Sequence, residues 1–467
     1  MSIAIAIGFT QARWLTGAGA ALFAAASWAA GGTPAVLHGY TVMGADGVAQ
    51  ARVVTGAAQC PVLRVDGKAI AMSERAAPGE APVRSGAQAD AKPADFPVRI
   101  CEAALPAGAR AVRVAGRRLP VPAAAPRRIV IVGDSGCRIK ASDNEFQNCN
   151  NPAYWPYGRV SRAAAAFKPD LVIHVGDYHY RESPCPAARK DCAGSVWGYG
   201  YDVWEADLLK PAAPLLRAAP WVFVRGNHES CARAGQGWFR LLDPLPYSAA
   251  RSCDDPANDA QADYSEPYAV PLSDAYQLIV FDSANAKNKA YRAEDPAYQR
   301  YSEEVAKVDE LARQRPHNIF LSHHPVLGFA SSDEGTYRPG NQGLQSVMAA
   351  SHPQRLFAPG IDLALHGHVH MFQALSFSSG QPATIVAGNS GDTLETPLKA
   401  SPPVDVAPAP GAVLSEFFKR SEFGFLTMER VRQGWRYTER DVRGSPQLTC
   451  LLQEAALHCT PVAAQRR

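Results

Sequence analysis

The sequence lacks three features that would each point to a different class of protein. It has no long basic run and no basic stripe with interleaved aromatic residues, so its charge pattern gives no support for nucleic-acid binding. Beyond the first 30 residues it has no apolar run long enough to cross a membrane. It has no CxxC pair, which argues against a thiolate metal site. A net charge of +3 on 467 residues is close to neutral.

The first 30 residues have the pattern of an export signal. Arg13 precedes an Ala-rich apolar stretch at residues 14–26, and the small residues Ser27 and Ala29 follow it. An uncleaved anchor is the alternative, because only one positive charge precedes the stretch. We predict a signal peptide at residues 1–30, export to the periplasm or the medium, and no membrane attachment after the signal is removed.

The ten cysteines agree with export. An even number of cysteines in an exported chain predicts disulfides, although the count leaves their connectivity open. Pairing of sequence neighbours would join Cys60 with Cys101, Cys137 with Cys149, Cys185 with Cys192, Cys231 with Cys253, and Cys450 with Cys459. Three of these pairs flank the polar motifs described below, where a disulfide would reduce the entropy of the loops.

The character of the chain changes near residue 125. Residues 31–125 contain short β-type runs between Gly, Pro and Ala-rich turns, without a helical period. From residue 127 onward, strands alternate with helix-like segments, which is typical of an α/β fold. We predict a small all-β sandwich domain of the immunoglobulin or fibronectin type at 31–125, followed by a larger α/β domain at 126–467.

Five short polar motifs each follow directly on an apolar run. They are GDSG at 133–136, GDYHY at 176–180, GNHE at 226–229, FLSHH at 320–324 and GHVH at 367–370. The apolar runs are typical of buried strands, and ligands bind in the crevice beyond the carboxyl ends of such strands. Asp, Asn, His and Tyr delivered repeatedly to that edge form a metal-ligand pattern. We therefore predict a site for two metal ions.

Two adjacent ions need one shared ligand and several terminal ones. A carboxylate can bridge because both of its oxygens carry charge, and Asp177 is the candidate bridge. Asp134 would bind one ion, and Asn227 offers a neutral carbonyl oxygen. The imidazoles of three further residues suit iron, zinc or manganese: His323, His368 and His370.

The order of the motifs resembles that of the purple acid phosphatases, in the calcineurin-like metallophosphoesterase superfamily. The pattern of that family is GDxG, GDxxY, GNH(E/D), VxxH and GHxH. Four motifs match in full, and Phe320 replaces the Val of the fourth. In the wider superfamily a His ligand commonly stands at the position of Gly136. Tyr180 can fill its place here, and a phenolate favours Fe(III) over a divalent ion.

The resemblance implies a metallophosphoesterase fold, in which a two-sheet β-sandwich is flanked by helices and preceded by the small β-sandwich. It assigns Asp134, Asp177, Tyr180 and His370 to Fe(III). It assigns Asp177, Asn227, His323 and His368 to a divalent ion, which would be Zn, Fe or Mn. The implied catalytic residues are Asp177, as the bridge, and His228, which would contact the phosphate and protonate the leaving group.

The activity implied by the resemblance is hydrolysis of small phosphomonoesters by attack of a metal-bound hydroxide. A phosphodiesterase or nucleotidase on the same scaffold is an alternative, because the surrounding loops select the ester. A surface binding protein with a silent metal site is a further alternative, which the complete ligand set disfavours.

Five residues within or next to the motifs are candidates for contacts with the ligands or the substrate: Glu229, His324, His366, His179 and Arg225. Glu229 would orient His228 or cap a helix. Arg225 is expected to pair with a local carboxylate rather than with phosphate. His174, inside a predicted strand, is expected to be a hydrogen-bonded core histidine.

Overall fold

The computed structural model describes residues 36–84, 91–402 and 406–462. The predicted signal peptide at residues 1–30 lies outside these ranges. Within them, no helix is both long enough and apolar enough to span a bilayer. The described residues all fall in one compact unit.

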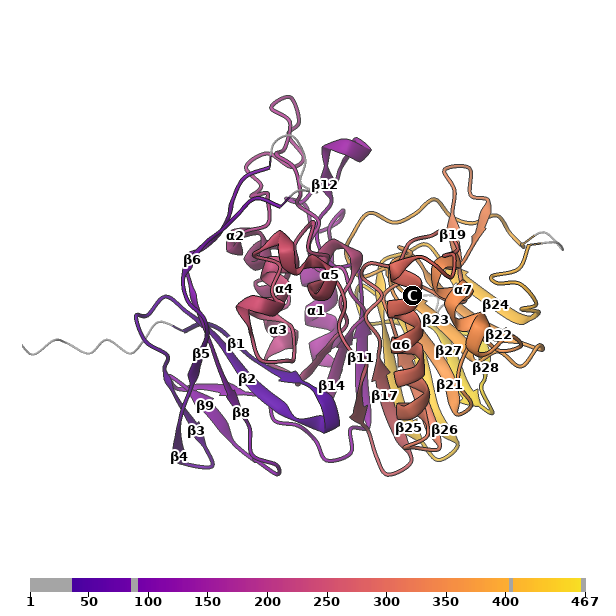
Figure 1. Cartoon of the computed structure of the whole chain (residues 1–467), viewed down its shortest axis with the longest axis horizontal. Coiled ribbons are helices and arrows are strands. Elements are labelled where there is room, and N and C mark those ends of the chain that lie inside the picture. The colour runs from indigo at the N-terminus through magenta and orange to yellow at the C-terminus, as the bar shows by residue number, and fades with distance from the viewer. Residues whose placement is uncertain (1–35, 85–90, 403–405, 463–467) are drawn as a thin grey trace, which may run out of the picture. The chain divides into compact units, whose positions relative to one another are not determined.

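The larger of two main sheets has eleven strands and joins N-terminal strands, in indigo, to C-terminal strands, in yellow (Figure 1). Its strands, in spatial order, are β28 (Ala456–Pro461), β27 (Pro446–Gln453), β26 (Gly434–Asp441), β25 (Gly424–Val431), β11 (Arg128–Val132), β14 (Leu171–His174), β15 (Trp221–Phe223), β1 (Val36–Met43), β2 (Ala49–Thr55), β8 (Arg99–Ala104) and β5 (Ser73–Ala76). The neighbours β11, β14 and β15 are parallel. The strands that carry the first three motifs therefore end at the same edge.

The second main sheet has seven strands. They are, in order, β16 (Tyr268–Pro271), β17 (Tyr276–Val280), β18 (His317–Leu321), β21 (Ile361–His366), β23 (Ala383–Ala387), β22 (Phe372–Phe377) and β24 (Leu414–Arg420). Its central neighbours β17, β18, β21 and β23 are parallel. The last two motifs follow β18 and β21, so they also share one edge.

Alternation along the central strands creates three apolar layers. In β11, Ile129 and Ile131 belong to a core shared with Ile319 and Leu321 of β18, so this core lies between the two sheets. Val130 points the other way, into a core formed with helices. Because successive side chains of a strand point to opposite faces, a strand buried on both faces must be apolar throughout.

Helices cover the outer face of each sheet. The core on the outer face of the larger sheet includes residues of α1 (Tyr157–Ala166), α2 (Tyr201–Trp204), α3 (Ala213–Leu216), α4 (Gly235–Leu241) and α5 (Asp259–Ala262). The core on the outer face of the second sheet includes residues of α6 (Pro296–Ala312) and α7 (Gln342–Ser351). The predicted two-sheet sandwich flanked by helices is thereby confirmed.

The region before residue 126 is rich in β-structure, as predicted. Besides β1, β2, β5 and β8 it contains a four-stranded sheet and a hairpin, formed by β10 (Arg117–Leu119), β9 (Val112–Val114), β3 (Val62–Val65), β4 (Lys68–Ala71), β6 (Gly79–Ala81) and β7 (Ala94–Phe96). β1 runs parallel to β15, with Val42 opposite Trp221. The larger sheet is therefore continuous across residue 125, and the division into two domains at that point stays a prediction.

All ten cysteines lie in the described residues, and all five predicted pairs are disulfides. Cys450 and Cys459 stand opposite each other on the neighbouring strands β27 and β28. Cys137–Cys149 and Cys185–Cys192 pack together in a small cluster with Ile139. This disulfide cluster therefore stiffens the loops that follow the first two motifs, including the hairpin of β12 (Ile139–Lys140) and β13 (Glu145–Phe146).

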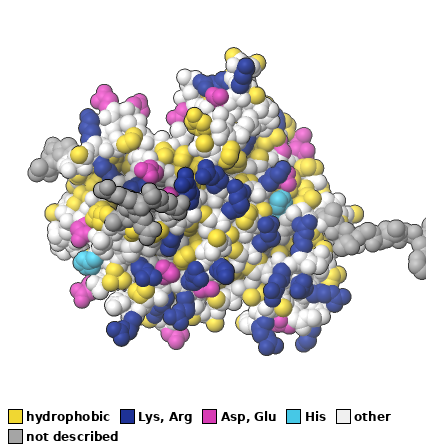
Figure 2. Space-filling view, turned by 180° about the vertical axis from the view of Figure 1, so that it is seen from behind, with side chains coloured by type: hydrophobic (Ala, Val, Ile, Leu, Met, Phe, Trp, Pro, Cys, Tyr) yellow, Lys and Arg dark blue, Asp and Glu magenta, His cyan; other side chains and the backbone are white. Residues whose placement is uncertain are grey.

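Basic side chains are dispersed over the face opposite to that of Figure 1. Figure 2 shows Lys and Arg spread across its central and lower parts, with Asp, Glu and apolar side chains between them. The small positive net charge is therefore distributed over a broad surface.

Protonation of Glu304 in α6 makes the free energy of unfolding depend on pH. Its carboxylate is buried, and neither oxygen has a hydrogen-bond partner among the described residues. Burial, and then the nearby Asp282, raise its pKa from 4.5 to about 9. Between these values the folded state holds a proton that the unfolded state has lost, so stability falls as the pH rises.

We expect Glu304→Gln to raise the melting temperature at pH 8 and to change it little at pH 4. The gain at pH 8 should be roughly 1–3 kcal/mol, because each unit of pKa shift corresponds to about 1.4 kcal/mol and the buried amide offsets part of it. Calorimetry at both pH values measures this, with the exposed neighbour variant Glu303→Gln as the control. An equal change at both pH values would contradict the titration of Glu304.

Candidate metal centre

The five motifs meet at one edge of the sandwich, where the parallel strands β11, β14, β15, β18 and β21 end. Three of the predicted ligands take up left-handed backbone angles there: φ is 52° at Asp134, 55° at Asp177 and 67° at His368. Positive φ is uncommon outside glycine and concentrates at functional sites. The chain thus turns sharply at each of these positions and directs the side chains toward the centre.

Two glycines make room for this arrangement. A Cβ atom at Gly226 would collide with the carboxylate of Asp177. A Cβ atom at Gly136 would lie 2.9 Å from Cδ2 of the Tyr180 ring. The carbonyl oxygen of Tyr178 would lie at 2.7 Å and Asp207 Oδ2 at 2.9 Å, so the place where the wider superfamily commonly has a His side chain admits none here, and the ring of Tyr180 lies beside it. This geometry agrees with the predicted exchange of a His ligand for a Tyr ligand.

The first group of predicted ligands surrounds the hydroxyl of Tyr180. This oxygen lies 3.0 Å from Asp134 Oδ1, 2.9 Å from Asp177 Oδ2 and 3.1 Å from His370 Nε2. All four side chains are buried. One phenol proton cannot serve two carboxylates at once. A cation placed among these atoms would satisfy both carboxylates, so the donors fit a metal ion.

The second group surrounds the side-chain oxygen of Asn227. Oδ1 lies 3.0 Å from His323 Nε2 and 3.0 Å from His368 Nδ1. His323 Nε2 is also 3.1 Å from Asp177 Oδ2. Ligand atoms of Asp177, His323 and His368 all lie within 4.8 Å of one another, close enough to hold one ion. Asp177 thus contacts both groups, as a bridging ligand would.

Hydrogen bonds behind two imidazoles determine which nitrogen faces the centre. Nδ1–H of His323 donates to the carbonyl of Val175 at 2.9 Å, and Nδ1–H of His370 donates to the carbonyl of Thr393 at 2.8 Å. In both rings Nε2 therefore faces the other donors, which is how ligating histidines are commonly oriented.

The electrostatic field of the site favours positive charge. Although burial acts in the opposite direction, the carboxylate of Asp177 raises the pKa of His323 to about 9, and Asp392 does the same for His370. Burial, Asp134 and Asp177 together raise the pKa of the Tyr180 hydroxyl well above its ordinary value. A bound cation would reverse the effect on Tyr180, since metal ions acidify their ligands. Carboxylate, phenol, amide and imidazole donors suit iron, zinc or manganese.

His228 lies beside both groups of ligands. Its Nε2 is 3.8 Å from Asp177 Oδ2, and its ring centroid is 4.0 Å from that of Tyr180. Its Nδ1 donates to the carbonyl of His179 at 2.9 Å. Burial, and then the guanidinium of Arg233, lower the pKa of His228 to about 4. The ring is held at the place where a residue that contacts substrate is expected.

Glu229 and Arg225 hold the backbone of the site. Glu229 accepts hydrogen bonds from the backbone N–H groups of Gly226, Asp177 and Tyr178, at 3.1, 3.2 and 2.9 Å. It therefore caps the short 3₁₀ turn at Asn227–Glu229 and ties the second motif to the third. Arg225 donates to the carbonyls of Glu229 and Ala262, and its Nη1 lies 3.5 Å from a carboxylate oxygen of Asp282. Arg225 has the expected local partners.

The remaining histidines of the motifs have different surroundings. His324 contacts the hydroxyl of Ser283, and its ring lies 4.2 Å from that of His368. His366 contacts the hydroxyl of Ser322 at 2.9 Å, inside the strand. The ring of His179 packs beside that of Tyr199, at 5.2 Å.

His174 is the hydrogen-bonded core residue that the sequence predicts. Its Nε2 lies 2.9 Å from the hydroxyl of Ser135, and the backbone N–H of Gly176 donates to its Nδ1. Its ring stacks on that of Tyr178 at 4.0 Å. It therefore supports the first two motifs from within the core.

Two charged pairs near the centre have no counterpart in the predicted set. Arg138 pairs with Asp392 and stands over the ring of Tyr180, and Asp392 Oδ2 lies 3.4 Å from His370 Nδ1. Arg233 pairs with Glu182 next to His228. Arg138 and Asp392 are 254 residues apart, so no local pattern could have identified them.

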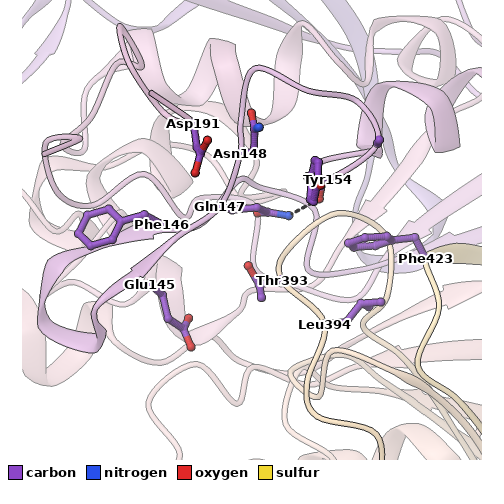
Figure 3. A pocket seen from close by; sticks show the side chains of 10 residues that line it. Glu145, Phe146, Gln147, Asn148, Tyr154, Asp191, Thr393, Leu394 and Phe423 are labelled. Carbon is purple, nitrogen blue, oxygen red and sulfur yellow. Dashed lines mark hydrogen bonds between the residues drawn. The ribbon is translucent and has the colours of Figure 1, made fainter. Parts of the chain in front are cut away.

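A cavity of about 560 Å³ lies beside the first group of ligands. Figure 3 shows Phe423 and Leu394 on one side of it and Asp191 and Asn148 on another. Its wall includes Thr393, whose carbonyl accepts the hydrogen bond from His370. Its full lining is Glu145, Phe146, Gln147, Asn148, Ala153, Tyr154, Asp191, Thr393, Leu394 and Phe423. Several of these residues belong to the loops that the disulfides Cys137–Cys149 and Cys185–Cys192 close.

Residues 127–372 match the family model of the calcineurin-like phosphoesterases. This span covers more than half of the chain and includes all five motifs. The chain belongs to the calcineurin-like phosphoesterase family. It is therefore a metallophosphoesterase with a metal cofactor, and its activity is hydrolysis of phosphoric esters.

The fold is similar to those of two solved structures. Purple acid phosphatase PPD1 from seeds of yellow lupin (Lupinus luteus) is 16% identical, with a TM-score of 0.51, over 92% of this chain and 74% of that chain. The structure of PhoD is 11% identical, with a TM-score of 0.54, over 93% of this chain and 94% of that chain. At these identities the similarity shows the fold alone. The sequence has no significant match among curated proteins.

Proposed function

We propose that this metallophosphoesterase is an exported phosphatase of the purple acid phosphatase type, which hydrolyses small phosphomonoesters with two metal ions. The observation that carries the proposal is the position of Asp177, whose carboxylate contacts both groups of ligand atoms. The Tyr180 hydroxyl between Asp134 and Asp177 supports a ferric ion in one of the two places. The five disulfides support export.

In this proposal the residues divide into two sets that share Asp177. Asp134, Tyr180 and His370 would hold Fe(III) with it, and Asn227, His323 and His368 would hold a Zn, Fe or Mn ion with it. Bound there, the ions would supply charge to stabilise the phosphoryl oxygens and to acidify water. The residues of the chain would fix the ions, orient the ester and handle the proton of the leaving group.

We expect His228→Ala to slow esters with poor leaving groups more than activated aryl esters. His228 lies beside Asp177 on the site, where its protonated form, which the lowered pKa of about 4 confines to acidic solution, would donate a proton to a departing alkoxide. General acid catalysis contributes about 10²- to 10⁴-fold, and a nitrophenolate leaving group needs little of it. Comparison of kcat/KM for an alkyl phosphate and 4-nitrophenyl phosphate measures the difference. His352→Ala, in a ring that pairs with Asp309 away from the centre, is the control. Equal losses on both esters would contradict the role.

A nucleotidase is the second candidate, and the cavity in Figure 3 favours it. Its wall combines the aromatic rings of Tyr154 and Phe423 with the amide of Asn148. Aromatic faces and amide groups are suited to stack on and hydrogen-bond to a nucleobase. Thr393 in the wall of the cavity accepts a hydrogen bond from His370, so a base bound in the cavity would lie next to the phosphate.

Metal analysis together with a panel of esters on one purified sample tests the proposal. The expected result is two ions per chain, one of them iron, with higher kcat/KM for simple monoesters than for diesters. Preference for nucleoside monophosphates would support the nucleotidase. A colourless protein that contains only zinc would reject the ferric assignment. A protein that is loaded with two ions and hydrolyses none of the esters would support a binding protein with a silent site.

A further inference from the structure

Arg233 occupies an unusual position beside the metal centre. Its Nε donates to Glu182 Oε2 at 3.1 Å, and its Nη2 donates to Glu182 Oε1. Tyr199 donates its hydroxyl to the same carboxylate at 3.0 Å. The side chain of Glu182 is 3% exposed and that of Arg233 is 17% exposed. The edge of the guanidinium formed by Nε and Nη2 is therefore held by the buried carboxylate of Glu182, whose position the hydroxyl of Tyr199 also fixes.

The guanidinium lies against the ring of His228, with its Nη2 2.6 Å from Nδ1. Its Nη2 lies 2.7 Å from His228 Nε2, and that nitrogen lies 3.8 Å from Asp177 Oδ2, the atom nearest to the Tyr180 hydroxyl. The other terminal nitrogen, Nη1, makes no hydrogen bond within the described residues and is not one of their buried unsatisfied atoms. Nη1 is therefore free of protein partners, in a side chain that is 17% exposed and that contacts the residue expected to contact the phosphate.

Arg225 shows what a purely structural arginine looks like in the same region. Each of its three nitrogens has a partner in a carbonyl, a disulfide sulfur or a carboxylate, and none of these is a predicted metal ligand. Arg233 uses only one edge for such partners. The difference points to a ligand for the free edge of Arg233.

We propose that Arg233 binds a non-bridging oxygen of the phosphoryl group and thereby makes the enzyme select monoesters over diesters. The inference rests on the proposed phosphatase function and adds the residue that would select its substrate. A monoester dianion has three non-bridging oxygens, so one is left for a protein cation after two have faced the metal ions. A diester has only two, and its second alkoxy group would face the guanidinium instead.

Arginine is suited to this role because its N–H groups form a planar fork that matches phosphate oxygens and stays charged at all relevant pH values. Glu182 orients the fork before substrate arrives, so little rearrangement is needed on binding. In the free enzyme, the ion pair with Glu182 also compensates the mostly buried charge of Arg233.

The test compares Arg233→Gln and Arg233→Lys with the wild-type holoenzyme. We expect Arg233→Gln to lower kcat/KM for 4-nitrophenyl phosphate by about 10- to 10²-fold, the usual effect of losing a hydrogen bond to a charged group. The loss for bis(4-nitrophenyl) phosphate should be less than about 3-fold, since that ester presents no third oxygen. Arg233→Lys should recover part of the monoester activity, because it keeps the charge without the fork.

Affinity for inorganic phosphate provides a readout that does not depend on turnover. Calorimetric titration should show a Kd for phosphate that rises about 10-fold or more in Arg233→Gln. The matched control is Arg240→Gln, which removes another mostly buried guanidinium paired with a carboxylate, that of Asp254, away from the centre. The control should leave the monoester-to-diester ratio and the phosphate affinity unchanged. Melting temperatures show whether each variant is folded, and Arg233→Lys carries the test if Arg233→Gln is not.

Equal losses on monoester and diester, or an unchanged affinity for phosphate, would overturn the role of Arg233. A wild-type protein that is loaded with metal but neither hydrolyses monoesters nor binds phosphate would overturn the proposed function itself. The two failures are therefore distinguishable, since the first appears only in the variants and the second already appears in the wild type.

Discussion

Asp177→Asn is expected to abolish phosphoesterase activity and to reduce the metal content below two ions per chain. The carboxylate of Asp177 contacts a side chain in each group of predicted ligands, Tyr180 on one side and His323 on the other. An amide is neutral and offers only one oxygen, so it cannot bridge two cations as a carboxylate does. The substitution keeps the shape of the side chain and removes its charge.

The expected fall in kcat is at least about 10³-fold, because loss of a single neutral oxyanion-hole donor already costs about 10²- to 10³-fold. Elemental analysis and steady-state kinetics on the same sample measure both effects. Asp170→Asn is the control: Asp170 accepts backbone hydrogen bonds from Arg127 and Arg128 at the opposite end of β11. Two tightly bound ions and wild-type activity in Asp177→Asn would show that Asp177 is not the bridge.

Tyr180→Phe is expected to remove the visible absorption band that a phenolate bound to Fe(III) would produce. The substitution deletes only the oxygen that lies between Asp134 and Asp177, and the ring still fills the space that Gly136 leaves. The fold is therefore expected to stay intact while the ferric site loses an anionic ligand. The absorption spectrum and the iron content of the purified variant measure the result.

Tyr178→Phe is the matched control for this experiment. Tyr178 is also buried in the second motif, but its hydroxyl donates to the carbonyl of Val224 at 2.7 Å, away from the predicted ligands. The band should persist in Tyr178→Phe. A band of unchanged intensity in Tyr180→Phe would mean that the phenol is not bound to iron.

The predicted ligands come together because each one follows its strand within a few residues. Asp134 stands two residues after β11, and Asp177 stands three residues after β14. Parallel strands of one sheet end at the same edge, so their first loop residues must be neighbours. The sandwich of two such sheets then brings His323 and His368 to the same edge. A short-range signal was enough to predict this part of the site.

The N-terminal region shows where local patterns stop being informative. Short β-type runs predict strands there, and strands are present. Their continuation of the larger sheet depends on the pairing of β1 with β15, which are far apart in the sequence. Buried guanidinium groups strengthen the connection: Arg52 donates to the carbonyl of Leu241 at the end of α4. Neither contact has a signature in composition or periodicity.

The sequence by itself determined the family and the seven candidate ligands, because both depend on motifs in a fixed order. It predicted disulfides between sequence neighbours but left their connectivity open, and the structure decided the five pairs. Only the tertiary structure decided which charged side chains surround those ligands. Arg138 meets Asp392, and Arg233 meets Glu182, because loops from distant parts of the chain converge above the strand ends. Long charged side chains in loops have no periodic pattern, so their partners depend on the folded arrangement. The free edge of Arg233, and with it the residue inferred to select monoesters, became visible only there.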